Sequence, residues 1–491
     1  MNTLLGLLNA IGIEESHLVQ TPVIKKICHN SKECIESSVF FAFPGMHTQG
    51  ELYIEDAIAR GAICIFSTRP VLKKQEKILY YVTEKPRTLF SQMCAAFYGW
   101  PSRSMEIIGV TGTDGKSTTS DYLYQILQAK GCKVGLLGTV SMDDGGGKRP
   151  SPYRQSTPEA DQLHFFLSRC KENNLSHVIL ECTSHALSKE YDRLATIEFS
   201  QALVTTISSE HLEFHKSLEA YVDAKCNLVR ALRAGGTFLT TRQNPYKTQF
   251  LDALPPFSYA HLLEKSLPFT TVESDLGTVD IQHKQTTIFT PLALPCLANN
   301  AMLALFSASL ILDVEAEELL PLLANLDTVA GRMISIDNSH SLRVIIDFAH
   351  TADAYEQLFS HMKKTAKGGN LIALFGSAGE RDTSKRPHMG RIASHYADRI
   401  ILTEEDPRGE DDANICKDIR SQMENTNCII EEIGDRTAAI QRAIELSKPG
   451  DTLLFLGKGH ETTIEGSGGK RPWNEEETVR TMLKNKKVEA L

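Results

Sequence analysis

Short apolar runs alternate with longer amphipathic segments along most of this chain. The runs predict buried strands, and the amphipathic segments between them predict helices. Parallel strands need a long crossover, usually a helix, so this alternation favours parallel sheets with helices on both faces. We therefore expect an α/β fold built from more than one such sheet.

The pattern divides into three parts. The first has predicted strands at 39–43, 62–66 and 78–82, a predicted helix at 53–60, and an apparent linker at 100–102. The second has predicted strands at 105–109, 134–137, 177–181 and 200–205, and predicted helices at 118–130 and 161–173. The third has predicted strands at 342–347, 371–375, 399–403 and 452–456, separated by helical segments. We predict domains at 1–103, 104–328 and 329–491, the last two with doubly wound sheets.

Composition narrows the class of protein. The 491 residues are 42% apolar, which is ample for folded cores, and the net charge of −9 disfavours a nucleic-acid binder. Eleven scattered cysteines without metal-finger spacing fit reduced thiols. Residues 1–13 predict a helix rather than a signal peptide, and no run approaches the roughly 18 apolar residues that cross a bilayer. We expect a cytoplasmic enzyme without membrane insertion.

One motif carries most of the chemical information. Gly109-Val-Thr-Gly-Thr-Asp-Gly-Lys116-Ser117 lies between a predicted strand and a predicted helix. That arrangement turns backbone N–H groups and a helix N-terminus toward a phosphate. Lys116 would meet the β- and γ-phosphates of a nucleotide, and Ser117 would bind Mg²⁺. The alternative is an ordinary glycine-rich turn.

Other candidate residues are ambiguous taken singly. Glu181 ends a predicted parallel strand, where it suits Mg²⁺ or simply faces solvent. His211 is either a metal ligand or structural, and a helical lysine such as Lys225 is normally a solvated surface group. Further polar groups near predicted strand ends suit a nucleotide or a surface role: Arg332, Asp347, His350 and the glycine turn at 376–379.

Taken together and in order, these motifs resemble those of the Mur ligases, which form amide bonds in peptidoglycan precursors. The matching segments are His29-Asn-Ser-Lys32, the phosphate loop, Ser156-Thr-Pro-Glu159, Glu181-Cys-Thr-Ser-His-Ala-Leu187, Glu210-His-Leu-Glu-Phe-His215, Ala224-Lys225, Asn300, Gly331-Arg332, Asp347-Phe-Ala-His350, Gly379 to Pro387 and Gly457 to Glu461. The resemblance implies three domains: an N-terminal UDP-muramoyl-binding domain, a central P-loop ATPase domain, and a C-terminal Rossmann-like domain that binds the amino acid.

The resemblance also implies roles for individual residues. ATP would be bound by Thr111, Gly112, Thr113, Asp114, Gly115, Lys116, Ser117, Thr118, Asn300, Arg332, Asp347 and His350. The UDP-muramoyl dipeptide would be bound by Ser31, Ser156, Thr157, Thr183, Ser184 and Arg193. Mg²⁺ would be held by Ser117, Glu181, His211 and a carbamylated Lys225, with Lys116, His211 and Lys225 catalytic. The amino acid would be bound by Arg381, Glu405, Asp406, Arg408, Gly457 and Glu461.

The implied reaction is ATP-dependent addition of an amino acid to UDP-N-acetylmuramoyl-L-alanyl-D-glutamate through an acyl phosphate. Family members that select meso-diaminopimelate usually carry Asp-Asn-Pro-Arg where this chain has Glu405-Asp-Pro-Arg408. The extra negative charge of Asp406 favours lysine or ornithine over diaminopimelate. Alternatives are ligation of diaminopimelate, a folylpolyglutamate synthetase, and a catalytically silent relative that acts as a binding protein, because Glu210 and Glu213 replace the usual aspartates. We expect a monomer.

Overall fold

The computed structural model describes residues 2–15, 21–45, 48–153, 155–263, 269–273, 278–283, 286–366, 368–424 and 427–486. The chain divides into two compact units. The first comprises residues 1–112, 127–204 and 222–262, and the second comprises 113–126, 205–221 and 263–491. Each unit holds its own sheets and its own apolar core.

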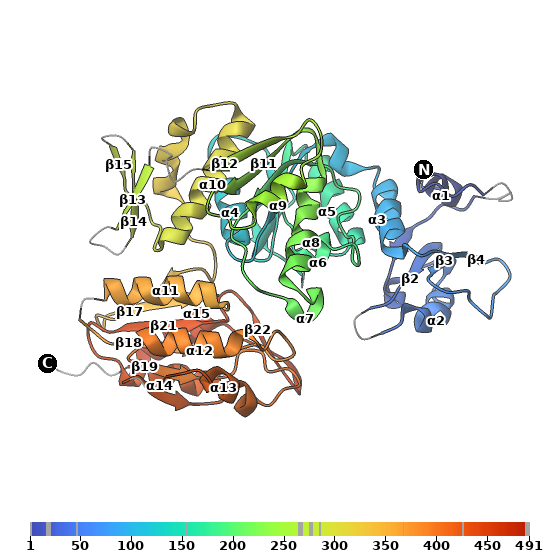
Figure 1. The fold of residues 1–491 in the computed structure, drawn as a ribbon. Helices are drawn as coiled ribbons and strands as arrows, with labels where there is room; N and C mark the ends of the chain where they lie inside the picture. Colours follow the sequence, from blue (N-terminus) through green and yellow to red (C-terminus); the bar gives the residue numbers. More distant parts are fainter. Residues whose placement is uncertain are drawn as a thin grey trace. The chain divides into compact units, whose positions relative to one another are not determined.

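A small parallel sheet opens the first unit (Figure 1, blue). Its strands, in spatial order, are β1 (Lys26–Cys28), β2 (Ser38–Ala42), β3 (Ala62–Ser67) and β4 (Leu79–Val82). Around it lie α1 (Leu4–Ala10), the 3₁₀ turns η1 (Ser31–Glu33) and η2 (Gly50–Tyr53), α2 (Ile54–Ala59) and α3 (Pro86–Phe97).

Successive strand residues point to opposite sides of this sheet, and helices cover both faces. Phe41 packs with α1 and α3 on one face, whereas Phe40 packs with α2 on the other. The predicted strands 39–43 and 62–66 therefore appear as β2 and β3. The segment predicted as a linker, 100–102, is largely buried. Pro101 and Ser102 are buried in the 3₁₀ turn η3 (Pro101–Ser104), and the Arg103 guanidinium stacks 4.2 Å from the Trp100 ring centroid.

The larger sheet of the first unit has eight strands, in the order β12-β11-β10-β5-β9-β6-β7-β8. Their bounds are β5 (Glu106–Thr111), β6 (Val134–Leu137), β7 (Ser141–Asp143), β8 (Arg149–Pro150), β9 (His177–Glu181), β10 (Phe199–Val204), β11 (Leu232–Thr241) and β12 (Tyr259–Leu263). Pairings among β11, β10, β5, β9 and β6 are parallel, and the β6–β7–β8 edge is antiparallel. This is the doubly wound sheet expected from the sequence.

The helices that accompany these strands follow the predicted alternation. In chain order they are α4 (Lys116–Ala129), α5 (Ala160–Glu172), α6 (Ser184–Leu187), α7 (Leu212–His215), α8 (Leu218–Arg230) and α9 (Lys247–Asp252). The predicted helices 118–130 and 161–173 correspond to α4 and α5. Residues Gly145 to Lys148 are exposed in the turn between β7 and β8.

The second unit is built on a six-stranded sheet, in the order β16-β17-β21-β18-β19-β20. Its strands are β16 (Ile334–Ser335), β17 (Arg343–Asp347), β18 (Leu371–Phe375), β19 (Arg399–Leu402), β20 (Ile429–Glu432) and β21 (Thr452–Leu456), with a separate hairpin of β22 (Thr463–Gly466) and β23 (Gly469–Pro472). All pairings in the six-stranded sheet are parallel except that of β16 with β17.

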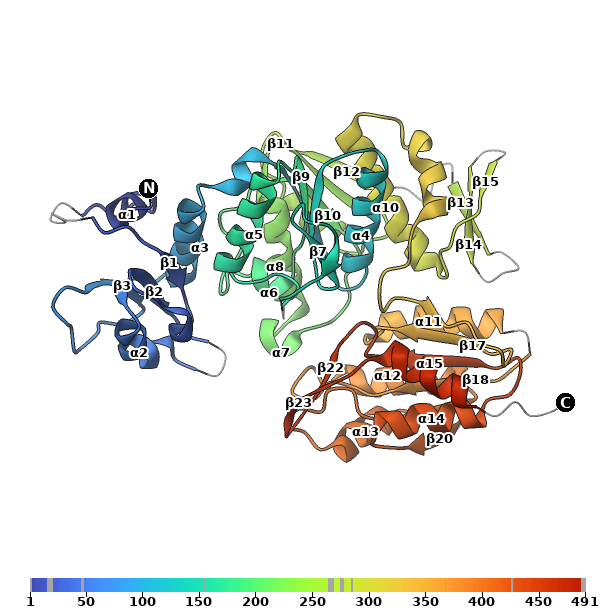
Figure 2. The same cartoon turned by 180° about the vertical axis from the view of Figure 1, so that it is seen from behind.

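Helices cover both faces of this sheet. One face packs against α11 (Ala352–Thr365), α12 (Lys385–Tyr396) and α13 (Asp412–Arg420), through a core that includes Phe359 and Phe375 (Figure 1). The other face packs against α14 (Arg436–Leu446) and α15 (Glu475–Asn485), as Figure 2 shows from behind. This confirms a second doubly wound unit.

The remaining elements of the second unit are an antiparallel sheet and an apolar helix. The sheet contains β13 (Phe269–Glu273), β14 (Val279–His283) and β15 (Thr286–Ile288). The helix α10 (Pro295–Leu312) has 18 residues and enough mean hydropathy to cross a membrane by composition alone. It nevertheless buries the polar side chains of Asn300 and Ser307 and packs beside the 3₁₀ segment η4 (Ala316–Asn325), as a core helix does.

Candidate active site

The ends of three parallel strands define the candidate site in the first unit. β5 ends at Thr111, β9 at Glu181 and β10 at Val204. Because these strands are parallel neighbours, their carboxyl ends lie at one edge of the sheet. The phosphate loop continues directly from β5, and ligands of open α/β sheets bind at this edge.

Glu181 presents a buried and firmly held carboxylate. Its side chain is 2% exposed, and its two oxygens accept hydrogen bonds from the Thr139 N–H (3.0 Å) and the Thr139 hydroxyl (2.8 Å). The Thr157 hydroxyl donates to the Glu181 backbone oxygen at 2.7 Å. A carboxylate held in this way is of the oxygen-ligand type that suits a hard cation such as Mg²⁺.

Lys225 is enclosed in the protein, not exposed as a lone helical lysine normally is. It is 1% exposed on α8, and its ammonium donates to the Gly112 backbone oxygen at 2.7 Å and lies 3.5 Å from Thr111 Oγ1. This places its nitrogen at the start of the phosphate loop. Burying a charge is costly unless it is paired, so a lysine enclosed to this extent is unusual.

The rest of the phosphate loop, in the second unit, is built around tight backbone approaches. Gly115 has φ +87°, and a Cβ there would lie 2.6 Å from Asn300 Oδ1. Thr113 is fixed by Tyr221, whose hydroxyl lies 2.9 Å from Thr113 Oγ1. The Lys116 ammonium folds back to the Thr113 backbone oxygen at 2.6 Å. The predicted adenine-site residue and the loop are therefore neighbours.

His211 lies between the two glutamates that replace the family's aspartates. Its Nε2 is 3.7 Å from Glu210 Oε2, and its Nδ1 is 3.5 Å from Glu213 Oε1. The backbone of His211 is left-handed, with φ +57°, at the start of α7. The longer glutamates thus still reach the histidine that the shorter aspartates flank in the family pattern.

Glu210 also contacts His350, one of the nucleotide-binding residues predicted in the C-terminal part of the chain. His350 Nε2 lies 3.2 Å from Glu210 Oε1, and His350 Nδ1 lies 2.8 Å from the Phe348 backbone oxygen. Both ring nitrogens therefore face acceptors, which favours the charged imidazolium. Burial opposes that charge, yet the hydrogen bond that His350 donates to Glu210 raises the pKa of His350. Burial likewise opposes charge on Glu210, but the charge of His211 and the bond to His350 lower its pKa.

The other predicted nucleotide residues in this part of the chain are also grouped. Arg332 stacks on the Phe348 ring at 4.7 Å, and the Asp347 carboxylate accepts from the N–H groups of Met333 (2.8 Å) and Ala349 (2.7 Å). Burial raises the pKa of Asp347, and the Arg332 charge opposes that rise. The Nε of Arg332 is buried without a hydrogen-bond partner, which leaves a donor for a ligand.

A cavity of about 530 Å³ in the first unit contains the predicted uridine-side residues. Ser31, Lys32 and Arg193 line it, together with Arg87 and Tyr191. The Arg87 guanidinium lies 4.2 Å from the Phe43 ring centroid and 4.4 Å from that of Tyr191, so two aromatic faces hold it flat. These basic groups suit an anionic substrate such as a nucleotide diphosphate.

A hydrogen-bond network joins this cavity to Glu181. Arg193 donates to the Thr157 backbone oxygen at 2.9 Å and pairs with Glu159 at 2.7 Å. The Thr183 N–H donates to Thr157 Oγ1 at 3.0 Å. Ser156 Oγ is 2.7 Å from Thr139 Oγ1, and Ser184 is buried in the first turn of α6. The structure thus brings together the predicted muramoyl-peptide residues of the first unit.

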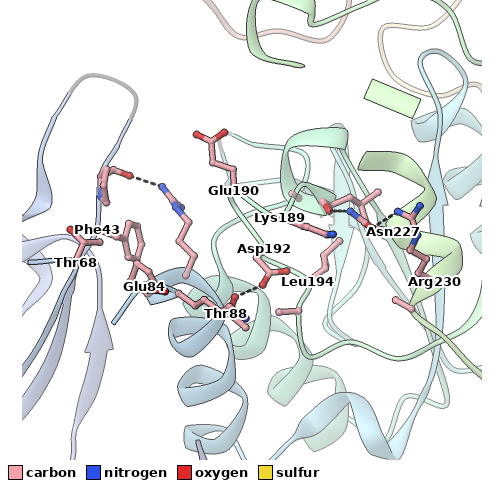
Figure 3. A pocket seen from close by; sticks show the side chains of 18 of the residues that line it. Phe43, Thr68, Glu84, Thr88, Lys189, Glu190, Asp192, Leu194, Asn227 and Arg230 are labelled. Carbon is pink, nitrogen blue, oxygen red and sulfur yellow. Dashed lines mark hydrogen bonds between the residues drawn. The ribbon is translucent and has the colours of Figure 1, made fainter. Parts of the chain in front are cut away.

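A larger cavity, of about 730 Å³, contains none of the predicted site residues (Figure 3). Its polar groups bond to one another: Thr88 Oγ1 donates to Asp192 at 2.5 Å, and Arg230 donates to Asn227 at 2.7 Å. Size alone is therefore a poor guide to the site in this molecule.

The predicted amino-acid residues surround a fully buried lysine. Lys458 is 0% exposed and donates to Asp406 at 2.8 Å and to Glu461 at 2.5 Å. Glu405 is also buried, and its Oε2 has no hydrogen-bond partner. A Cβ on Gly457 would lie 2.5 Å from that oxygen. Burial raises the pKa of Glu461, Lys458 opposes the rise, and the charges of Asp406 and Glu405 add to it.

The two predicted arginines of this region lie differently. Arg408 donates to the Gly379 backbone oxygen at 2.5 Å and lies 3.5 Å from Glu465. Its backbone is left-handed, with φ +53°. Arg381 lies on an exposed bend. Arg408 is therefore engaged with protein groups, and Arg381 is exposed to solvent.

Sequence reasoning missed Arg87 and Lys458. Arg87 follows Pro86 at the start of α3, where nothing in the local pattern marks it as a ligand, and Lys458 lies within a matched motif whose other residues drew attention.

Among the residues that the structure describes, no three His, Cys, Asp or Glu side chains form a metal cluster. That does not conflict with Mg²⁺, which usually takes one or two carboxylates plus phosphates and water.

Comparison with known proteins identifies the family. Residues 110–308 match the Mur ligase middle domain, and residues 331–459 match the Mur ligase glutamate ligase domain. The UDP-N-acetylmuramyl-tripeptide synthetase of Borrelia garinii subsp. bavariensis is 37% identical over 472 residues, covering 94% of this chain and 93% of that protein.

Two solved structures share the fold. A UDP-N-acetylmuramoyl-L-alanyl-D-glutamate–2,6-diaminopimelate ligase has a TM-score of 0.65 and 24% identity, covering 98% of this chain and 99% of its own. A MurF ligase from Thermotoga maritima in complex with ADP has a TM-score of 0.64 and 17% identity, covering 94% and 97%. They confirm the predicted three-domain α/β architecture. The chain belongs to the Mur ligase family and is an ATP-dependent ligase.

Proposed function

We propose that this ligase adds an amino acid with a terminal amine, lysine or ornithine, to UDP-N-acetylmuramoyl-L-alanyl-D-glutamate. The observation that carries the choice of amino acid is Glu405, whose buried Oε2 has no partner in the protein. An unpaired buried carboxylate oxygen is costly, and a ligand ammonium would satisfy it. Relatives named tripeptide synthetases support the acceptor substrate.

Charge at the amino-acid site supports the same choice. Glu405, Asp406 and Glu461 interact electrostatically around the single ammonium of Lys458. Lys458 pairs with both Asp406 and Glu461, and the buried Arg436, which interacts with Glu405, is itself paired with Glu475. The carboxylates therefore outnumber the cations, which favours a ligand cation. The distal carboxylate of meso-diaminopimelate would add negative charge beside them, whereas lysine and ornithine end in an amine alone.

The proposed reaction has two steps. The D-glutamate γ-carboxylate attacks the γ-phosphorus of ATP, the bond to ADP breaks, and an acyl phosphate forms. The amine of the incoming amino acid attacks the acyl carbon, and the tetrahedral intermediate expels phosphate as the amine loses its proton. The backbone N–H groups of the phosphate loop and Lys116 would bind the transferred phosphoryl group, and the cavity around Arg193 would orient the carboxylate.

Mg²⁺ belongs to this proposal. Ser117, Glu181, His211 and a carbamylated Lys225 would hold it, and the bound ion would offset the charge of the phosphates. Glu181 fits because its carboxylate is buried and held in place by the N–H and the hydroxyl of Thr139. Lys225 fits only after carbamylation, which turns a buried cation into an oxygen ligand. We also propose a cytoplasmic monomer.

The test supplies lysine, ornithine and meso-diaminopimelate separately with ATP and the dipeptide precursor. We expect kcat/KM to be highest for lysine or ornithine, and preference for diaminopimelate would overturn the assignment of the amino acid. Lys116→Ala should abolish phosphate release that depends on the precursor. Phosphate release retained by that variant, or absent from the wild type with every amine, would overturn the reaction itself.

A further inference from the structure

Two cysteine sulfurs touch in the N-terminal sheet of the first unit. Cys28 Sγ and Cys34 Sγ are 2.9 Å apart, and the residues are 0% and 5% exposed. Cys28 ends β1, and Cys34 follows η1, so the turn folds one thiol back onto the other. A disulfide needs sulfurs about 2.05 Å apart, so a shift of less than about 1 Å would join them.

The surroundings give the two sulfurs different roles. The hydrogen bond from Cys28 lowers the pKa of Cys34, burial opposes this, and the ammonium of Lys26 lowers it further. The same bond and burial raise the pKa of Cys28. These opposite shifts favour Cys34 as the nucleophile and Cys28 as the thiol that resolves it. Cys64 lies on β3 of the same sheet, separated from β1 by β2, and burial alone raises its pKa.

We propose that Cys28 and Cys34 are a redox-sensitive dithiol, oxidised to a disulfide by a two-electron oxidant of the peroxide class. The Cys34 thiol loses its proton, the resulting thiolate attacks a peroxide oxygen, and the O–O bond breaks to give a sulfenic acid and hydroxide, which takes up that proton as water. Cys28 gives up its proton and attacks Cys34 Sγ, and hydroxide leaves with that proton as water. The two thiols lose two electrons, and one hydrogen peroxide becomes two waters. A dithiol reductant reverses the bond.

The position of the pair gives the modification a consequence for binding. Asn30, Ser31 and Lys32 lie between the two cysteines and line the 530 Å³ cavity. The Asn30 side chain accepts from the Lys32 N–H at 3.1 Å, which fixes the turn in its present shape. Closing the disulfide moves this turn and weakens binding of a uridine nucleotide. The predicted effect on uridine-nucleotide binding rests on the proposed function, which assigns the cavity to the precursor.

The modification is tested by peptide mapping of the full-length wild-type protein treated with hydrogen peroxide. Trypsin cleaves after Lys26, Lys32 and Arg60, so the disulfide joins peptide 27–32 to peptide 33–60. We expect that linked pair without reductant and two separate peptides after dithiothreitol. A Cys28–Cys34 pair that stays reduced while other cysteines oxidise, or that over-oxidises without linking, would overturn the proposal.

Binding of UDP and of ADP to reduced and oxidised protein tests the consequence. We expect oxidation to raise the Kd for UDP several-fold, to leave that for ADP unchanged, and to have no such effect in Cys34→Ala. Cys64→Ala is the matched control, because it removes a buried thiol of the same sheet and should keep the response. An unchanged Kd in linked protein would overturn the coupling. Failure of UDP to bind even the reduced protein would instead contradict the proposed function and leave the mapping result standing.

Discussion

Glu210 and His350 form a partly buried hydrogen-bonded pair, with Oε1 and Nε2 3.2 Å apart, between the segment after β10 and the segment after β17. Folding raises the pKa of His350 above 6.5 and lowers that of Glu210 below 4.5. The histidine contribution to stability is complete below pH 6.5 and is lost as pH rises through its raised pKa. The glutamate contribution is present above pH 4.5 and is lost as pH falls through its lowered pKa.

Glu210→Gln should therefore destabilise the protein most between pH 4.5 and pH 6.5. The expected loss is about 2 kcal/mol, the scale of a hydrogen bond between charged groups. Thermal unfolding midpoints of the wild type and Glu210→Gln, measured from pH 5 to pH 9, check this. The difference should shrink at alkaline pH. An equal difference at pH 6 and pH 9 would show that the loss comes from packing rather than from charge.

Gly115→Ala should weaken ATP binding. The new Cβ would meet Asn300 Oδ1 at 2.6 Å and would also strain a left-handed backbone by about 1–2 kcal/mol. We expect KM for ATP to rise at least about tenfold, which corresponds to 1.4 kcal/mol. Gly147→Ala is the matched control, because Gly147 has φ +96° but nothing within 4 Å of a Cβ. Equal effects of the two substitutions would rule out the contact with Asn300 as the cause.

Arg87→Met should weaken binding of the UDP-muramoyl precursor. The substitution keeps an apolar stem between Phe43 and Tyr191 but removes the charge from the cavity. KM for the precursor should rise about tenfold, with KM for ATP unchanged. Arg103→Met, which removes a guanidinium stacked 4.2 Å from Trp100 and absent from the cavity lining, should leave both constants unchanged. A rise in KM for ATP with Arg87→Met would mean that the change is not confined to the cavity.

Asp406→Asn should shift the choice of amino acid. It restores the neutral residue usual in diaminopimelate-selecting relatives and leaves Lys458 paired with Glu461 alone. The ratio of kcat/KM for meso-diaminopimelate to that for lysine should rise about tenfold, a change of 1.4 kcal/mol. Glu432→Gln, on the outer strand β20, serves as the control and should not alter the ratio. A ratio unchanged in Asp406→Asn would remove this residue from the explanation of specificity.

Lys225→Met should lower turnover by at least about 100-fold while keeping the buried volume filled. We also expect wild-type activity to fall in buffer freed of carbon dioxide and to recover with bicarbonate, whereas Lys225→Met responds to neither. Lys130→Ala, at an exposed position after α4, controls for the loss of a lysine. Full wild-type activity without carbon dioxide would contradict carbamylation.

The local pattern of apolar and polar residues was sufficient to predict much of the fold. The strands predicted at 134–137 and 177–181 coincide with β6 and β9, because buried parallel strands are continuous apolar runs with clear ends. The phosphate loop was likewise marked by glycines that its backbone requires. The burial of Pro101 within the predicted linker at 100–102 was not predictable, because it depends on tertiary packing that no local pattern reveals.

The candidate site was less predictable for the same reason. Lys225 has the sequence pattern of a surface lysine, and only the fold shows it enclosed against Gly112. Asp406 suggested an uncompensated negative charge, yet the fold pairs it with Lys458, more than fifty positions later in the chain. Charged residues far apart in the sequence but close in the fold define the electrostatics of a site, and the local sequence pattern does not show which of them meet.

The enclosure of Lys458 also bears on the design of inhibitors. Its ammonium is held by Asp406 and Glu461 and has no solvent-exposed surface, so an inhibitor's acidic group would have to displace a carboxylate already in place to reach it. Glu405 Oε2 requires no such displacement. Compounds that carry a basic tip should therefore discriminate between this enzyme and ligases built for a dicarboxylate, and the selectivity would come from a single oxygen atom.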